Sequence, residues 1–315
     1  IYLMNSLLQT WQLDGVDIDL DGASVSITGG TVAAPVDSTI IRFIDAMNEV
    51  MIDYRQATGT KMFLTMAPET AYVQGGQSAF GGIWGAYLPI IDALRDSLDI
   101  LHVQLYNSGS MYGIDGGIYA QGTADFIVSQ TEAVIQGFNT GGGFFAGLPP
   151  GKVAVGLPAC TAAAGGGYVD TATVRAAMEY LLGEGPQPGS YMLAQPGGYP
   201  GLRGMMTWSI NWDAAGSCDG TYTFAENFTR IFGALSTGAG EPGPEDLPGF
   251  PDPVANTLDL PGPGVFRIFD ATGRTVRTIT VRDARSMVDV SGLASGLHIL
   301  CGTLGSRPVM GRFIT

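Results

Sequence analysis

The chain has 315 residues, of which 45% are hydrophobic and 14% charged, and soluble domains usually carry roughly 25% charged residues. This composition argues against disorder, because disordered chains are poor in apolar residues and rich in charge. The formal net charge of −14 disfavours partners bound through phosphate groups, so we expect no nucleic acid and no anionic membrane. No apolar run reaches the roughly 18 residues of a membrane span, and we predict no membrane insertion.

Short β-branched segments alternate with longer amphipathic segments in the first part of the chain, a pattern typical of β/α units around a parallel sheet. The five predicted strands are Gly15 to Leu20, Lys61 to Met66, Ile100 to Tyr106, Lys152 to Leu157 and Gly204 to Trp208. Two intervening segments, Ile40 to Gln56 and Ile83 to Leu98, have the apolar spacing of helices. Five such units cannot close an eight-stranded barrel.

The composition changes near Thr237, where a stretch dense in Pro, Gly and acidic residues begins. Such a stretch predicts an extended, semi-rigid linker. The residues after it alternate in hydrophobicity over short runs separated by turn signals, which indicates a small all-β module. We therefore predict an α/β domain over residues 1–236, a linker over 237–249 and a β-sandwich over 250–315.

The segment DGVDIDLDG, from Asp14 to Gly22, is the strongest chemical signal in the sequence. In an extended strand, Asp17, Asp19 and Asp21 point to one face and the apolar residues between them to the other. Like charges at this spacing repel, so we expect at least one carboxyl to have a raised pKa and to hold a proton near neutral pH. A held proton is what a general acid requires.

A calcium loop is the alternative for this segment, because Asp17-x-Asp19-x-Asp21-Gly22 matches the first half of an EF-hand. The twelfth position would be Thr28 where the loop needs Glu, and the preceding residues resemble a strand. We therefore predict neither a metal ion nor a cofactor. The chain has only two histidines and three widely spaced cysteines, which do not form the ligand pattern of a zinc site. A disulfide bond between Cys160 and Cys218 is geometrically feasible.

The acidic segment resembles the D-x-x-D-x-D-x-E signature of glycoside hydrolase family 18. Four further segments follow in the family's order, namely LTMAPE (64–69), VQLYN (103–107), VGLPA (155–159) and MTWSINWD (206–213). The resemblance covers roughly Ile1 to Leu235 and is to the bacterial chitinase D type. It implies a (β/α)8 TIM barrel in which the acidic segment is the fourth strand. We therefore expect an N-terminally truncated fragment that lacks the first three β/α units and exposes two aggregation-prone barrel edges.

The resemblance also implies a substrate-assisted, retaining cleavage of β-1,4-linked N-acetylglucosamine polymers, with chitin or chitooligosaccharides as partners. Asp21 would be the general acid, Asp19 would orient the substrate's N-acetyl group, and Asp17 would tune the charge of Asp19. Tyr106 would hydrogen-bond the acetamide. The substrate-binding residues implied by the same motifs are Met66, Glu69, Gln104, Asn107 and Trp208.

Several of these residues have a purely structural alternative. Met66 and Trp208 would be core residues in most proteins, and Glu69 could bind substrate or cap the next helix. The spacing places His102, Gln104 and Tyr106 on one face of their strand, where His102 is expected to be an interior residue rather than a catalyst. Trp84 and Trp212 fit either sugar platforms or packing, and the sequence leaves both interpretations open.

The sequence departs from the family at the acid, because Asp21 stands where the family has Glu. Its carboxyl is about one C–C bond, roughly 1.5 Å, shorter in reach. A misplacement of about 1 Å can lower a rate about a hundredfold, so we predict a weakened enzyme. The alternatives are a catalytically silent chitin-binding lectin and an endo-β-N-acetylglucosaminidase that acts on the chitobiose core of glycoproteins.

The C-terminal residues resemble a different family, the type A sorting domain of the type IX secretion system of Bacteroidota. The matching segments are FPDPVANTLDL (250–260), VFRIFDATGRTVRT (265–278), VDVSGLASGLHIL (288–300) and RFIT (312–315). Asp252 stands where Asn is common, and His298 where an aromatic residue is usual. The resemblance implies the type IX secretion machinery as a partner and a secreted or cell-surface protein. The alternative, a carbohydrate-binding sandwich, lacks a Trp in this segment.

Overall fold

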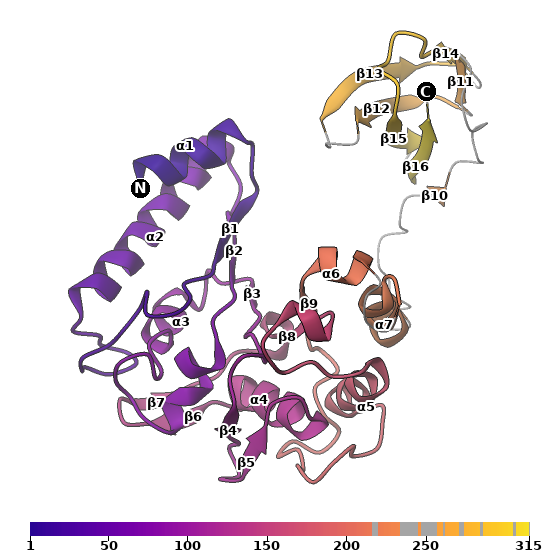
Figure 1. The fold of residues 1–315 in the computed structure, drawn as a ribbon. Helices are drawn as coiled ribbons and strands as arrows, with labels where there is room; N and C mark the ends of the chain where they lie inside the picture. The colour runs from indigo at the N-terminus through magenta and orange to yellow at the C-terminus, as the bar shows by residue number, and fades with distance from the viewer. Residues whose placement is uncertain are drawn as a thin grey trace. The chain divides into compact units, whose positions relative to one another are not determined.

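The computed structural model describes residues 1–215, 220–233, 245–246, 257–260, 262–270, 274–283, 286–304 and 307–314. The chain divides into two compact units, Ile1–Ala234 and Leu235–Thr315 (Figure 1). Each unit contains its own cluster of buried hydrophobic residues, and the two clusters share no residue.

Parallel strands form the centre of the first unit. β1 (Gly15–Ile18), β2 (Phe63–Met66) and β3 (Ile100–Leu101) make one ladder, and β8 (Ala154–Pro158) pairs with β9 (Gly204–Trp208) in another. Two isolated parallel bridges, Leu101↔Val153 and Gln104↔Gly156, join β3 to β8. The five predicted strands are therefore present in the order β1-β2-β3-β8-β9. The first three are shorter than expected, β8 begins and ends later, and β9 has the predicted bounds.

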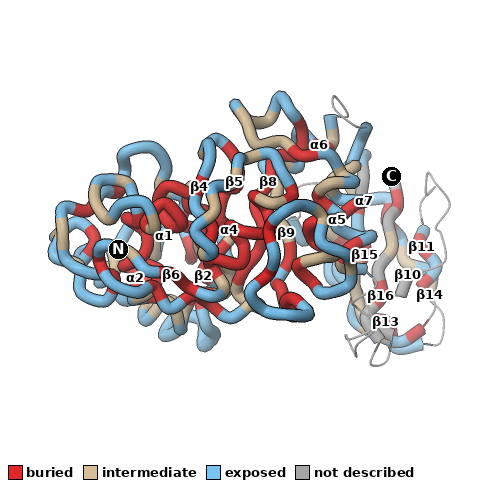
Figure 2. Tube along the Cα trace, turned by 90° about the horizontal axis from the view of Figure 1, so that it is seen from below, coloured by how far each residue is buried: buried red, intermediate tan, exposed pale blue. Residues whose placement is uncertain are grey.

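Helices and short hairpins connect these strands. The helices are α1 (Tyr2–Thr10), α2 (Ser38–Thr58), α3 (Leu88–Leu94), α4 (Ala124–Gln136), α5 (Thr171–Leu182), α6 (Ile210–Ala215) and α7 (Thr223–Phe232). The 3-10 turns are η1 (Thr70–Tyr72), η2 (Gln74–Gln77), η3 (Pro150–Lys152) and η4 (Thr161–Ala163). The hairpins pair β4 (Ser110–Tyr112) with β5 (Ile118–Ala120) and β6 (Phe138–Thr140) with β7 (Gly143–Phe145). Buried residues lie along the strands and the inner helix faces, with exposed residues outside (Figure 2).

The helix expected over 83–98 begins later than its apolar spacing indicated, at Leu88. Gly85 has a φ of +75°, a left-handed conformation that an α-helix cannot contain. Residues 81–84 instead form a tight turn in which Gly81 and Trp84 exchange backbone hydrogen bonds. Pro89 then occupies the first helical turn, where its missing N–H costs nothing. The apolar spacing over 83–98 therefore marks a buried segment, but only residues 88–94 of it are α-helical.

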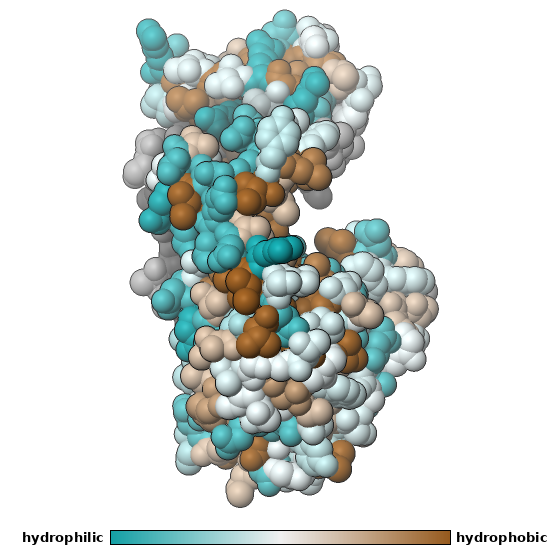
Figure 3. Space-filling model, turned by 90° about the vertical axis from the view of Figure 1, so that its left-hand side faces the viewer, coloured by the Kyte–Doolittle hydropathy of each residue, from teal (hydrophilic) through white to brown (hydrophobic). Residues whose placement is uncertain are grey.

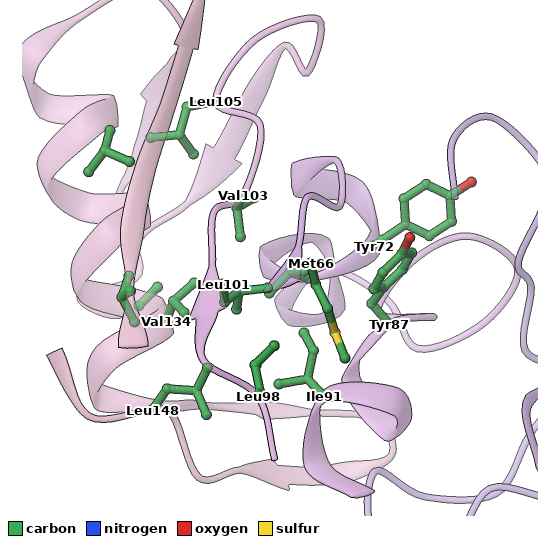
Figure 4. Close-up of a cluster of buried hydrophobic side chains, with 14 of the residues drawn as sticks. Met66, Tyr72, Tyr87, Ile91, Leu98, Leu101, Val103, Leu105, Val134 and Leu148 are labelled. Carbon is green, nitrogen blue, oxygen red and sulfur yellow. The ribbon is translucent and has the colours of Figure 1, made fainter. Parts of the chain in front are cut away.

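The main core lies between the parallel strands and the helices that cover them (Figure 4). Leu101 ends β3 and Val103 follows it, and Leu98 and Ile91 pack beside them from the preceding segment. All four are less than 5% exposed. This packing holds the C-terminal ends of β1, β2 and β3 at one edge of the sheet.

β1 lies at the end of the strand order, and its described residues pair with β2 alone. α1, which precedes it, leaves large apolar side chains in solvent, with Tyr2 88% and Leu3 70% exposed. Hydrophobic patches lie among hydrophilic ones on the face shown in Figure 3. The strands β1, β2, β3, β8 and β9 do not close into a barrel within the described residues. None of the helices described there is both long and apolar enough to cross a membrane.

The described elements of the second unit are strands. β10 (Glu245–Asp246), β16 (Arg307–Ile314), β15 (Leu297–Leu304), β12 (Gly264–Asp270) and β13 (Thr275–Val281) form a five-stranded sheet in that order. β11 (Thr257–Leu260) pairs with β14 (Ser286–Asp289). Leu258, Phe266 and Ile268 alternate with exposed neighbours and are fully buried, as a half-buried strand requires.

The three cysteines differ in state. Cys160 is disulfide-bonded and Cys301 is a free thiol. Cys218, the partner considered for Cys160 from the sequence, lies outside the described residues.

Candidate active site

The acidic segment crosses the C-terminal edge of the sheet. The ladder of β1 ends at Ile18, whose carbonyl accepts the N–H of Ala67, and Asp19 to Asp21 continue beyond it. The backbone N–H of Leu20 donates to the hydroxyl of Tyr87 at 2.6 Å. The Tyr87 hydroxyl thus accepts a backbone hydrogen bond just beyond the end of the strand ladder.

Asp17 is held by one residue of β2 and by one that follows β3. Thr65 Oγ1 donates to Asp17 Oδ1 at 2.5 Å, and His102 Nε2 lies 3.2 Å from the same oxygen. Burial by itself would raise the pKa of Asp17, but the hydrogen bonds from His102 and Thr65 outweigh it and hold the pKa below its ordinary value. The Nδ1 atom of His102 is buried, and no described residue hydrogen-bonds to it.

Asp19 and Asp21 share one amide group. Gln104 Nε2 lies 3.0 Å from Asp19 Oδ1, 3.3 Å from Asp21 Oδ1 and 2.7 Å from the Ala67 carbonyl. Burial, followed by the charge and hydrogen bonding of Asp21 and the charge of Asp17, raises the pKa of Asp19 to about 6. The raised pKa expected from the sequence therefore falls on Asp19, whose carboxyl holds its proton up to about pH 6.

Tyr106 and Asn107 follow β3 toward the same edge. Tyr106 is 5% exposed, and burial together with the negative charges of Asp19 and Asp21 raises the pKa of its hydroxyl. The hydroxyl therefore stays protonated and can donate. Asn107 is exposed with a φ of +55°, and its backbone N–H donates to the Gly166 carbonyl at 3.1 Å.

The other predicted binding residues lie in different settings. Glu69 Oε1 accepts the backbone N–H of Gly22 at 3.1 Å and makes no capping hydrogen bond to the helix it precedes. Trp208, at the end of β9, is 51% exposed. Met66 is fully buried, and its side chain points toward Ile91 and Tyr87 within the core (Figure 4). The structure thus brings Glu69 to the acidic segment and leaves no exposed surface on Met66.

Three residues at this site were not singled out from the sequence. Thr65 could have been found, because it is a polar residue within a buried strand and pairs in register with Asp17. Tyr87 and Tyr72 lie between β2 and α3, and no motif or periodic spacing in the sequence marks them as site residues. Their rings meet edge to face at 5.4 Å, and the Tyr72 hydroxyl is buried without a partner among the described residues (Figure 4).

The described part of the chain contains no group of three His, Cys, Asp or Glu residues placed to hold a metal ion. A cavity of about 400 Å³ lies between α1 and α2, and Leu13 and Asp14 line it immediately before β1. This cavity is therefore at the N-terminal edge of the sheet, opposite the acidic segment.

Comparisons with known proteins point to one kind of enzyme, although no family model matches the chain. It is 49% identical over 216 residues to chitinase D of Niallia circulans, a match that covers 67% of this chain and 40% of that protein. It is 40% identical over 241 residues to chitinase ChiA of Flavobacterium johnsoniae, a match that covers 73% of this chain and 15% of the relative. A family 18 chitinase structure from Chromobacterium violaceum is 40% identical with a TM-score of 0.61, over 72% of this chain and 57% of that one.

These similarities support membership of the family 18 chitinases of glycoside hydrolases and a TIM-barrel-type α/β fold for the first unit. The chain spans less than half the length of the Niallia and Flavobacterium chitinases.

Proposed function

We propose that this protein is a chitinase-like glycoside hydrolase that cleaves β-1,4 linkages between N-acetylglucosamine residues. The observation that carries the proposal is the contact of both Asp19 and Asp21 with Gln104, next to Asp17 at the C-terminal edge of parallel strands, in a chain similar to chitinases. Barrel enzymes hold their sites at this edge. Two neighbouring carboxyls, of which one has a raised pKa, are suited to glycoside cleavage.

The reaction that fits these residues needs no enzyme nucleophile. Asp21 donates its proton to the glycosidic oxygen while the carbonyl oxygen of the substrate's own N-acetyl group attacks the anomeric carbon and the glycosidic bond breaks. Asp19 accepts the acetamide N–H and stabilises the positive charge of the cyclic intermediate, and the Tyr106 hydroxyl donates to the attacking carbonyl oxygen. Water then opens the intermediate and returns a proton to Asp21, so that the anomeric configuration is retained.

The short reach of Asp21 sets the expected rate. We expect Asp21→Glu to raise kcat on chitotetraose by about ten- to a hundredfold, because it moves the proton donor by roughly one bond length. Asp21→Asn should abolish turnover. Product release is measured by chromatography on the full chain, and equal rates for Asp21 and Glu at this position would show that the shorter acid is no handicap.

The shortened acid also favours a second candidate, a chitin-binding protein without turnover. Calorimetric titration with chitotetraose separates the two functions. Binding without product in this chain would select the binding protein, whether or not Asp21→Glu forms product. Product formed by this chain itself supports the hydrolase.

We also propose that the first unit supplies strands four to eight of the barrel. The supporting observations are five parallel strands in sequential order and a β1 that pairs on one side alone in the described residues. The proposed domain bounds are 1–236 for this unit, 237–249 for the linker and 250–315 for the second domain.

We propose that the second domain is a β-sandwich that directs type IX secretion, so that the protein is secreted or held at the cell surface. Its strand content and the four matching segments support this proposal. Fused to a fluorescent reporter in a bacterium with this secretion system, residues 235–315 should bring the reporter to the medium or the cell surface. A reporter retained inside the cells would contradict the proposal.

A further inference from the structure

His102 is an interior histidine whose side chain faces the acidic segment. It lies two residues beyond Ile100 on the segment that continues β3, and its backbone N–H donates to the Met66 carbonyl at 2.9 Å. Asp17, Thr65 and Ile100 stand in register across the three strands. Because side chains alternate in an extended strand, His102 lies on the same face as this row. The imidazole thus reaches the acidic segment from the third strand of the ladder.

The imidazole contacts Asp17 through one nitrogen. Nε2 lies 3.2 Å from Asp17 Oδ1, which also accepts the Thr65 hydroxyl. Nδ1 is buried, and no described residue hydrogen-bonds to it. A carboxylate can only accept, so the hydrogen of this contact belongs to Nε2, and a hydrogen at Nδ1 would be buried without an acceptor. Because the His102 side chain is only 12% exposed, it has little room to turn, and it presents a fixed donor to Asp17.

Asp17 depends on such donors because its side chain is 47% exposed and could otherwise turn into solvent. Burial raises the pKa of Asp17, and the hydrogen bond from His102 is the first of the contacts that lower it below its ordinary value. The charged group that faces both residues is Asp19, since Thr65 is neutral and β8, the strand beyond β3, contains no titratable residue. Asp17 acts in turn on Asp19, because its charge contributes to the raised pKa of that carboxyl.

We propose that His102 is a positioning residue for the reaction, which holds Asp17 ionised and in place beside Asp19 while positive charge develops on the substrate. The inference rests on the proposed function and adds a residue that acts through Asp17. A charge that is already in place where the opposite charge develops lowers the barrier, because nothing has to reorganise during the reaction. The donor at Nε2 is the required feature, so a side chain that returns an N–H to that position can replace the imidazole.

The test is the pH dependence of kcat for chitotetraose cleavage, measured on full chains at pH 5, 6, 7 and 8. His102→Phe keeps a ring and removes both nitrogens, whereas His102→Gln returns an amide N–H close to the position of Nε2. His298→Phe is the matched control. His298 is 3% exposed in the second unit, its Nε2 lies 2.8 Å from the Ala294 carbonyl oxygen, and no described residue bonds its buried Nδ1.

Without the hydrogen bond from His102 the pKa of Asp17 rises, so Asp17 binds a proton at low pH and loses its charge. We therefore expect His102→Phe to lower kcat about tenfold at pH 5, with little change in KM. At pH 8, where Asp17 is ionised in either chain, the loss should shrink to about a factor of two. His102→Gln should recover most of the loss at pH 5, and His298→Phe should leave kcat unchanged.

If His102→Phe does not fold, His102→Asn carries the test, because its shorter amide does not reach the position of Nε2. A loss of kcat by the same factor at every pH, without recovery in His102→Gln, would show that His102 only packs. An unchanged kcat in His102→Phe, or an equal loss in His298→Phe, would also overturn the role, and all three results leave the hydrolase standing. If the parent chain forms no product at any of these pH values, the proposed function fails and the role of His102 fails with it.

Discussion

Leu20 lies between the two carboxylates of the candidate site, and its backbone N–H has a side-chain partner, the hydroxyl of Tyr87. Tyr87 is fully buried, so its hydroxyl cannot be replaced by bulk water. The ring of Tyr72 meets it edge to face and limits its movement. A single hydroxyl thus fixes the backbone from which Asp19 and Asp21 project.

We therefore predict that Tyr87→Phe lowers kcat on chitotetraose about tenfold or more, with little change in KM, because the acid is displaced. The unpaired Leu20 N–H should also lower the free energy of unfolding by about 1–3 kcal/mol. Tyr119→Phe, which removes a hydroxyl bonded to Asp115 in the β4–β5 hairpin, is the control. A loss of stability with unchanged kcat would show that Tyr87 has only a structural role.

The raised pKa of Asp19 makes stability depend on pH. Because the folded-state pKa is about 6 against an ordinary value of 3.8, the folded protein holds this proton more tightly than the unfolded chain. The resulting stabilisation is complete below pH 3.8, falls between pH 3.8 and about 6, and is absent above that. Asp19→Asn should remove this dependence.

Urea unfolding at pH 4, 5, 6 and 7 measures the effect. The stability of the parent chain relative to Asp19→Asn should fall steadily from pH 4 to pH 6 and then level off. Asp45→Asn, an exposed change on α2, should show no such trend. A relative stability that rises with pH would contradict the assigned direction of the pKa shift.

At the scale of elements, α4 holds a long loop through one buried carboxylate. Glu132 is 0% exposed and accepts the hydroxyls of Tyr191 at 2.6 Å and Tyr199 at 2.5 Å. It also accepts the backbone N–H of Ala194 at 3.0 Å. Burial, and then the hydrogen bond to Glu132, raises the pKa of Tyr191, so this hydroxyl remains a donor. The segment from 191 to 199 is therefore attached to α4 by polar contacts.

Glu132→Gln should lower the free energy of unfolding by about 1–3 kcal/mol, because the new NH2 group faces donors and leaves at least one of them unpaired. Glu226→Gln on α7 is the matched control, since Glu226 is exposed and bonds only Arg230 at 3.2 Å among the described side chains. Its loss should stay within about 0.5 kcal/mol. Equal losses in the two variants, measured by urea unfolding, would refute the anchoring role.

How far the elements could be predicted depended on whether their signal was local. The alternation of acids and apolar residues predicted a strand from Gly15 to Leu20, which the structure contains from Gly15 to Ile18, and beyond its end Gln104 contacts Asp19 and Asp21. The late start of α3 depends on Gly85, whose left-handed φ is set by the packing of its turn. The bond from Tyr87 to Leu20 joins residues 67 apart in sequence, which no local pattern encodes.

At the scale of the whole molecule, the two units have separate cores. The cluster of the first unit contains residues from Leu8 to Ile231, and that of the second contains residues from Leu258 to Phe313. Since packing contacts carry most of the stabilising free energy, two cores without a shared residue should unfold as two transitions. Leu181 in the first core and Phe266 in the second are both 0% exposed and test this expectation.

Phe266→Ala should destabilise the second unit by about 3–5 kcal/mol and lower the Tm of one calorimetric transition, because it leaves a cavity that the sheet cannot fill. The other transition and the rate of chitotetraose cleavage should not change. Leu181→Ala should instead destabilise the first unit, by about 2–5 kcal/mol, and leave the transition of the second unit unchanged. If either substitution lowered the Tm of both transitions, the two units would be thermodynamically coupled. Removing the second unit, as a sorting domain, would then also change the stability of the hydrolase unit.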